Sequence, residues 1–111
     1  MQSCKRFCVV YLFDVHPGKK QEFTRAWMEL TDAIYQHCGS MGSTLHHSGD
    51  NRYMAIANWP SKAIWEESST KLPGWAEAIQ IRMKSYCNSI ETVFAGERVS
   101  DMAKNAPFGN P

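Results

Sequence analysis

The sequence predicts a single α+β domain of the ferredoxin-like β-α-β-β-α-β class, with helices on one face of an antiparallel sheet. Three observations lead to this prediction: extended apolar runs near residues 7–15 and 90–95, a turn signal between two short extended runs in the middle, and amphipathic helical patterns between these strands. We place the domain at residues 1–100 and an irregular C-terminal arm at residues 101–111.

The first predicted strand and helix lie within residues 7–39. Residues 7–15 are rich in β-branched and aromatic types, and the following HPGKK contains the proline and glycine that end a strand. A helix then follows and ends at Gly39, because apolar residues recur every three or four positions. These residues are Phe23, Trp27, Leu30, Ile34 and Cys38.

The middle of the chain is predicted to form a β-hairpin. The sequence Gly49-Asp50-Asn51 is a turn signal, and it stands between extended runs at 43–47 and 52–59. These two runs should therefore form neighbouring antiparallel strands.

The second half of the chain is predicted to hold two helical segments and the last strand. Ser61 is placed to cap a short helix over residues 62–69. After the break TKLPGW, a further helix is expected over residues 75–86, and alternation over residues 90–95 predicts the fourth strand.

Both faces of the first strand are apolar. Phe7, Val9, Tyr11, Phe13 and Val15 alternate with Cys8, Val10 and Leu12. Helices are available for one sheet face only, so the other face needs a cover, and we expect a homodimer. In the C-terminal arm, Phe108 is expected to pack across the dimer partner.

Composition excludes several classes of protein. The chain of 111 residues carries 12 Lys and Arg against 11 Asp and Glu, without a basic stripe, which argues against nucleic acid as a partner. No run approaches the ~18 apolar residues of a membrane span, and no secretory signal is evident, so a cytoplasmic protein is expected. The four cysteines are scattered and have no metal-site spacing. We expect reduced thiols, no metal and no cofactor.

With these residues in view, the chain resembles the antibiotic biosynthesis monooxygenase domain family of the dimeric α+β barrel superfamily. The likeness covers residues 6–99 and is carried by VVYLFDVHPGKKQEFTRAW, YMAIANWPSKAIW and their spacing. It implies a dimer with sheets packed back to back and a pocket between sheet and helices in each subunit. Characterised branches imply cofactor-independent oxidation of phenolic or anthrone-like compounds, haem degradation, or handling of small quinones.

Two branches of that family have motifs that differ from this sequence. Against the anthrone-oxidising branch, Trp59 matches a tryptophan, but Ala55 stands for an asparagine and Trp65 for a tyrosine. Against the haem-degrading branch, Trp65 matches a tryptophan, while Tyr11 and Trp75 stand where an asparagine and a histidine are expected. We therefore expect haem to be neither ligand nor substrate.

The candidate substrate-binding residues are aromatic. Trp59 and Trp65 are suited to wall a pocket, because flat rings stack on aromatic ligands and the indole N–H can hold one polar atom. Trp27, Trp75 and Tyr11 complete the candidate set, with core packing as the alternative. Because Pro60 holds the backbone of Trp59 extended, we predict that Trp59 is structural and Trp65 faces the ligand.

His46 and His47 are the candidate catalytic bases. As neighbours on a strand they point to opposite faces, so they cannot share a metal ion, but one of them should face the helices. The alternative is a structural or surface role. The sequence thus favours a cofactor-independent monooxygenase acting on a small aromatic or quinone-like compound, and the rival is a non-catalytic dimeric module that binds a ligand or partner.

Overall fold

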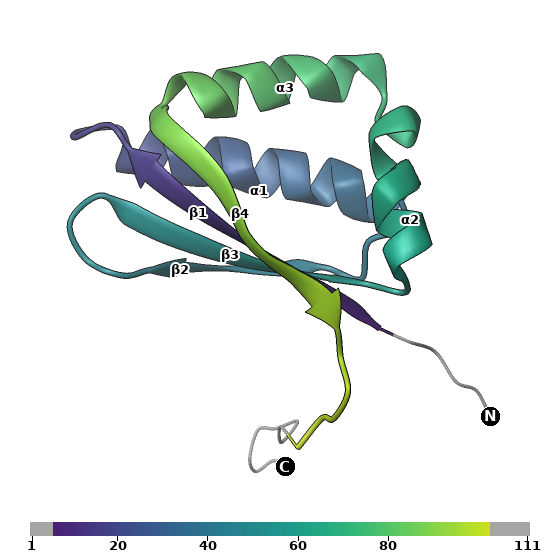
Figure 1. Cartoon of the computed structure of the whole chain (residues 1–111). Helices are drawn as coiled ribbons and strands as arrows, with labels where there is room; N and C mark the ends of the chain where they lie inside the picture. Colours follow the sequence, from purple (N-terminus) through teal and green to yellow (C-terminus); the bar gives the residue numbers. More distant parts are fainter. Residues whose placement is uncertain (1–5, 103–111) are drawn as a thin grey trace, which may run out of the picture.

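A four-stranded antiparallel sheet is the centre of the molecule in the computed structural model, which describes residues 6–102 (Figure 1). The strand order is β2-β3-β1-β4, with the two longest strand contacts made by β1. The bounds are β1 Phe7–Val15, β2 Ser43–His47, β3 Arg52–Trp59 and β4 Cys87–Glu97. This order and the alternation of helices and strands confirm the predicted ferredoxin-like class.

The helices cover one face of this sheet. They are α1 Lys20–His37, α2 Lys62–Glu67, the 3₁₀ turn η1 Ser68–Lys71 and α3 Gly74–Ser85. Figure 1 shows α1 and α3 side by side over the sheet, with α2 at one end. Ser61 caps α2 as predicted, because its Oγ accepts the Ile64 N–H at 3.2 Å. In the described part of the chain, no helix is long and apolar enough to cross a membrane.

The hairpin turn between β2 and β3 has the backbone that its sequence predicts. Gly49 and Asp50 both have positive φ angles, of 103° and 50°. This conformation suits the right-handed twist of a hairpin and favours glycine and aspartate at those positions. The turn sets the register in which His47 pairs with Tyr53 and Leu45 pairs with Ala55.

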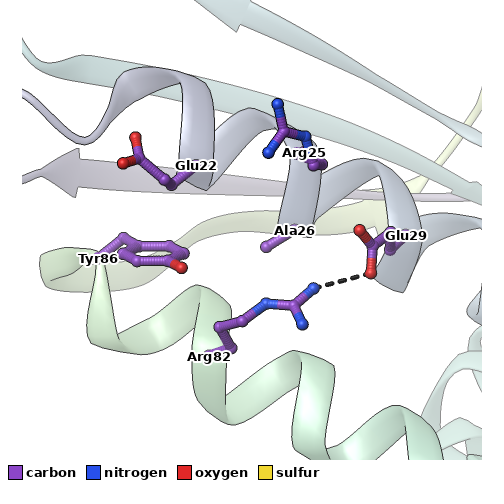
Figure 2. A pocket seen from close by; sticks show the side chains of 6 residues that line it. All are labelled: Glu22, Arg25, Ala26, Glu29, Arg82 and Tyr86. Carbon is purple, nitrogen blue, oxygen red and sulfur yellow. Dashed lines mark hydrogen bonds and ion pairs between the residues drawn. The ribbon is translucent and has the colours of Figure 1, made fainter.

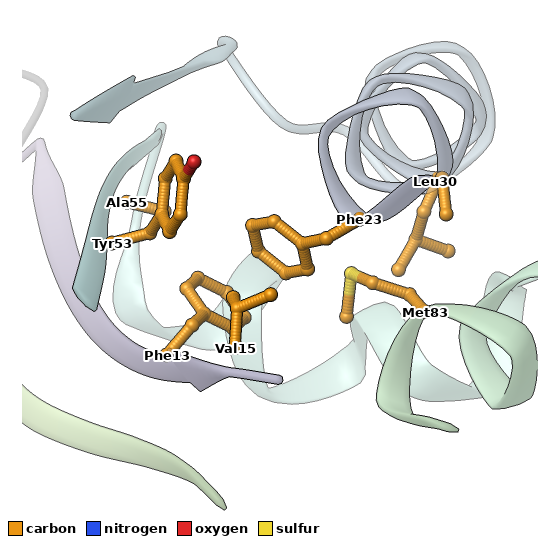
Figure 3. Close-up of a cluster of buried hydrophobic side chains, with 8 residues drawn as sticks. Phe13, Val15, Phe23, Leu30, Tyr53, Ala55 and Met83 are labelled. Atoms are coloured by element: carbon orange, nitrogen blue, oxygen red, sulfur yellow. The ribbon is translucent and has the colours of Figure 1, made fainter. Parts of the chain in front are cut away.

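Large aromatic residues fill one end of the space between sheet and helices. Phe23 of α1 is fully buried, and its ring lies 5.1 Å from that of Phe13 and 5.2 Å from that of Tyr53. Figure 3 shows these rings together with Leu30 and Met83. We call this group the packed cluster.

The opposite face of the sheet has no helix over it among the described residues. Val10 and Leu12 of β1 are half-buried there, and Phe94, the β4 partner of Val10, is 55 % exposed. The β1–β4 register shifts after this pair, leaving Val93 without a partner as in a β-bulge. The predicted packing of Phe108 lies outside the described residues.

Candidate ligand-binding cavity

A cavity of about 250 Å³ lies between the sheet and helices α1 and α3. Its wall is mainly apolar and aromatic, with a few polar groups, which is the usual composition of a small-molecule site. The lining residues come from six elements: Tyr11 and Phe13 of β1; Trp27, Leu30, Thr31 and Ile34 of α1; Ser43 of β2; Ala55, Ala57 and Trp59 of β3; Gln80, Met83 and Lys84 of α3; Ile90 and Thr92 of β4.

Two alanines on β3 explain why space remains there. Alternate residues of this strand point toward the helices, and they are Tyr53, Ala55, Ala57 and Trp59, all buried. At Tyr53 the large ring meets Phe23 and the space is filled. At Ala55 and Ala57 a methyl group is all that extends toward α1 and α3, so the cavity opens between the two large rings.

Trp59 lines the cavity and has an unused hydrogen-bond donor. The residue is 4 % exposed and lines the cavity, and its indole Nε1 is buried with no partner among the described residues. A buried donor without an acceptor destabilises a fold by about 1–3 kcal/mol. Such a group is unusual in a native protein and is explained if a ligand atom accepts the hydrogen bond.

Trp65 lies outside the cavity wall. Its Nε1 donates to the Tyr11 hydroxyl at 3.3 Å, and its ring packs against Phe7 with centroids 5.4 Å apart. The sequence predicted Trp59 as structural and Trp65 as ligand-facing, whereas Trp59 lines the cavity and Trp65 is not among its lining residues. The prediction used the Pro60 backbone, whereas side-chain direction follows from the alternation along β3.

Of the other candidate aromatic residues, two line the cavity and one does not. Tyr11 and Trp27 line the cavity. Trp75 is instead 59 % exposed at the start of α3, where its ring meets the edge of His37 at 5.7 Å. Tyr11 and Trp27 are thus placed to contact a ligand in this cavity, and Trp75 is not.

Neither predicted histidine base lines the cavity. His46 is exposed, on the sheet face away from the helices, and its Nε2 lies 2.9 Å from the Thr44 hydroxyl. His47 shares the helix-facing side with Tyr53, so one histidine does face the helices as expected. It is nevertheless exposed at the hairpin, where its ring stacks on Tyr53 at 4.6 Å and Nε2 donates to the Asp50 carbonyl at 2.8 Å.

Two titratable groups occur in the cavity wall, Tyr11 and Lys84. Sequence reasoning missed Lys84 and its neighbour Gln80, both on α3. The sequence feature that could have identified them is the apolar pair Ile79 and Met83, four residues apart, which marks the inner face of this helix. Gln80 and Lys84 each follow one of these residues and therefore lie at the edge of that face.

The thiols of Cys38 and Cys87 are poorly suited to act as nucleophiles, and the described residues form no metal centre. Burial raises the pKa of the Cys38 thiol, and burial followed by the Asp14 charge raises the pKa of Cys87 to about 11. Raised thiol pKa values reduce the reactive thiolate. Within residues 6–102 there is no group of three His, Cys, Asp or Glu residues that could hold a metal ion.

Two other hollows lie on the outer surface. A crevice of about 210 Å³ between α1 and α3 is lined by charged residues and spanned by the Arg82–Glu29 ion pair at 2.7 Å (Figure 2). A wider groove along α1, of about 500 Å³, includes Lys20, Met28 and Tyr53 and is more open to solvent. Neither has a buried donor, so the cavity beside Trp59 is the candidate site.

No protein-family model and no curated protein sequence matches the chain. Solved structures match its shape. SnoaB from Streptomyces nogalater, a cofactor-independent oxygenase, is 18 % identical with a TM-score of 0.69, over 89 % of this chain and 96 % of that one. A candidate antibiotic biosynthesis monooxygenase from Nitrosomonas europaea is 9 % identical with a TM-score of 0.72, over 89 % and 95 % of the two chains.

A NIPSNAP family protein from Agrobacterium tumefaciens has the same shape, with 14 % identity and a TM-score of 0.70, over 93 % of each chain. At these identities the likeness shows the fold. The resemblance predicted from the sequence is therefore confirmed at the level of the fold, and activity does not follow from fold alone.

Proposed function

We propose that the chain is a cofactor-independent monooxygenase of the antibiotic biosynthesis type, acting on a small aromatic or quinone-like compound. The observation that carries the proposal is an aromatic cavity with Trp59 in its wall, a residue whose Nε1 is unpartnered. The shared fold with SnoaB supports the reaction class. A cavity of about 250 Å³ is below the range of roughly 300–1,000 Å³ typical of drug-sized ligands, which favours a small substrate.

The chemistry requires an electron-rich substrate anion and dioxygen. Ionisation of a phenol or an anthrone places negative charge on the substrate oxygen. The anion transfers one electron to dioxygen, the resulting radical pair combines at carbon to form a peroxide, and loss of water leaves a carbonyl group. Overall, a CH₂ group and O₂ give C=O and H₂O, so the substrate itself supplies all the electrons.

Trp59 and Tyr11 are the residues that act on the charged oxygen. The indole N–H donates to it, and the Tyr11 hydroxyl, which already accepts a hydrogen bond from Trp65, has its own proton to donate. Donors fixed before the reaction in an apolar wall stabilise developing charge more strongly than water does. The described lining holds no carboxylate or imidazole, so the departing proton passes to water at the open side of the cavity.

Oxygen uptake tests this proposal. The purified protein with anthrone at pH 7, without added cofactor, should consume one O₂ per anthrone and form anthraquinone faster than the heat-denatured protein does. Label from ¹⁸O₂ should enter the new carbonyl, and no hydrogen peroxide should accumulate. An uptake rate equal to the denatured control for anthrone and for 1,4-dihydroxynaphthalene would contradict the proposal.

The second candidate function is a non-catalytic binding module. It is favoured by Ala55, which lines the cavity where the anthrone-oxidising branch has an asparagine, and by the exposed positions of His46 and His47. A module would bind a planar aromatic ligand, measured by calorimetry, without oxygen uptake. Oxygen uptake that depends on Trp59 would exclude it.

We further propose that two copies of the chain pack through their uncovered sheet faces. This proposal is supported by the apolar residues on that face, Val10, Leu12, Met54, Ile56 and Phe94. An apolar sheet face of this kind favours burial against a partner. Light scattering should give a dimer, and Leu12→Asp should produce a monomer. A wild-type monomer at micromolar concentration would contradict the dimer.

A further inference from the structure

We propose that the cavity takes an aromatic compound that carries an anionic group, with Lys84 binding the anion at the end of the cavity away from Trp59. This inference rests on the proposed function, because it concerns the same cavity, and it narrows the substrate class. The observations are the charge of the wall, the absence of a partner for Lys84 among the described residues, and the positions of the two polar groups.

Lys84 is the single charged side chain in the described wall of the cavity. It forms no ion pair or side-chain hydrogen bond within residues 6–102. Most of the described ion pairs instead join other residues that lie three or four positions apart on the surface. Its neighbour Arg82, two residues earlier on the outer side of α3, is paired with Glu29. The Lys84 ammonium group is therefore available to a ligand, because no carboxylate lines the cavity in the part of the chain that the structure describes.

Trp59 of β3 and Lys84 of α3 belong to segments that meet opposite ends of β1. Trp59 pairs with Phe7 at the start of this strand. Lys84 belongs to the last turn of α3, which is anchored at the other end because the Tyr86 carbonyl accepts the His16 N–H at 2.8 Å. Between them, the apolar wall runs past Ala57, Ala55 and Ile90. A ligand that reaches both groups is elongated and flat, with an oxygen acceptor at one end and an anion at the other.

Gln80 supports the same end of the cavity. It lies one helical turn before Lys84, is half-buried and lines the cavity. Its amide makes no described hydrogen bond to the protein, so it can donate to a carboxylate that Lys84 neutralises. A carboxylate is favoured over a phosphate because one ammonium and one amide match its single charge and two oxygens.

The test compares two nearly isosteric probes, 6-hydroxy-2-naphthoate and 6-hydroxy-2-naphthamide, by calorimetry at pH 7, because each has its hydroxyl and its carbonyl group at opposite ends of a flat ring system. The wild-type protein should bind the naphthoate about tenfold more tightly, since a charge-assisted hydrogen bond is stronger than a neutral one. Lys84→Met should abolish this preference and leave naphthamide binding unchanged, whereas Lys84→Arg should keep it. Added salt should weaken naphthoate binding alone.

Lys20→Met is the matched control, because Lys20 is also exposed and without a described ion pair but lies outside the cavity. It should retain the full preference. Equal binding of both probes by the wild type, or a preference that survives Lys84→Met, would overturn the role of Lys84 and leave the proposed function intact. Failure of both probes to bind would overturn the cavity as a ligand site, and both proposals with it.

Discussion

The two ends of the space between sheet and helices differ in how completely they are filled. At one end, Phe13, Phe23 and Tyr53 pack ring against ring in the packed cluster. At the other end, Ala55 and Ala57 leave the cavity open beside Trp59. The same strand, β3, contributes to both ends. The size of the side chains along β3 therefore decides which end stabilises the fold and which end leaves space for a ligand: the large ring of Tyr53 fills one end, and the small Ala55 and Ala57 leave the other open.

The packed cluster should dominate stability. Phe23→Ala removes a fully buried ring that touches two others, so it should lower the free energy of unfolding by about 3–5 kcal/mol. Urea denaturation followed by circular dichroism measures this loss. A loss below about 1 kcal/mol would mean that the cluster is loosely packed, and the contrast between the two ends would disappear.

Filling the cavity should have a smaller effect on stability. Ala57→Leu places a larger apolar side chain in existing space, so we expect the free energy of unfolding to change by less than about 1 kcal/mol while binding of 6-hydroxy-2-naphthamide is lost. Ala76→Leu is the matched control, because Ala76 is fully buried and outside the cavity wall. It should cost about 1–3 kcal/mol by overpacking. The reverse order of the two costs would show that the cavity is not present in solution.

A still smaller effect should appear in alkaline solution. Cys87 packs against the packed cluster, and burial, followed by the Asp14 charge, raises the pKa of its thiol to about 11 from an ordinary 9.0. Below pH 9 the thiol is neutral in both states, so its contribution is fully present. Between pH 9 and 11 the unfolded thiol ionises first, and that contribution is lost.

Because the thiol is only partly buried, the loss should be below about 1 kcal/mol after solvent screening. Unfolding of the wild type and Cys87→Ala at pH 8 and pH 10.5 isolates this term. The wild type should lose slightly more stability than the variant. An equal or smaller loss would mean that this end of the core is open to water.

The sequence predicted the elements well because their ends carry strong local signals. The bounds of β1, β2 and β3 match the predicted 7–15, 43–47 and 52–59, since Gly and Pro or the Gly49-Asp50 turn stop each run. The helix predicted over 62–69 changes to a 3₁₀ turn after Glu67, a change that no local signal marks. Turn chemistry is local, so one sequence was sufficient for it.

The site was harder to predict because it depends on how elements pack. Trp59 could have been assigned to the cavity from the alternation of Tyr53, Ala55 and Ala57, which places it toward the helices. The exposed position of His47 could not have been predicted in this way, because it depends on β2 being the edge strand of the sheet. The position of Lys84 beside the cavity follows from how α3 crosses the sheet, which the sequence does not specify.

Calorimetric binding of 6-hydroxy-2-naphthamide to Trp59→Phe and Trp65→Phe tests the central claim most directly. Trp59→Phe removes the unpartnered N–H and keeps an aromatic ring, so affinity should fall about tenfold while stability stays within about 1 kcal/mol of the wild type. Trp65→Phe removes the hydrogen bond to Tyr11 and part of the packing against Phe7 but no lining residue of the cavity, so affinity should stay within about twofold. Full affinity in Trp59→Phe, with the loss appearing in Trp65→Phe instead, would contradict the assignment of Trp59 as the ligand's hydrogen-bond donor.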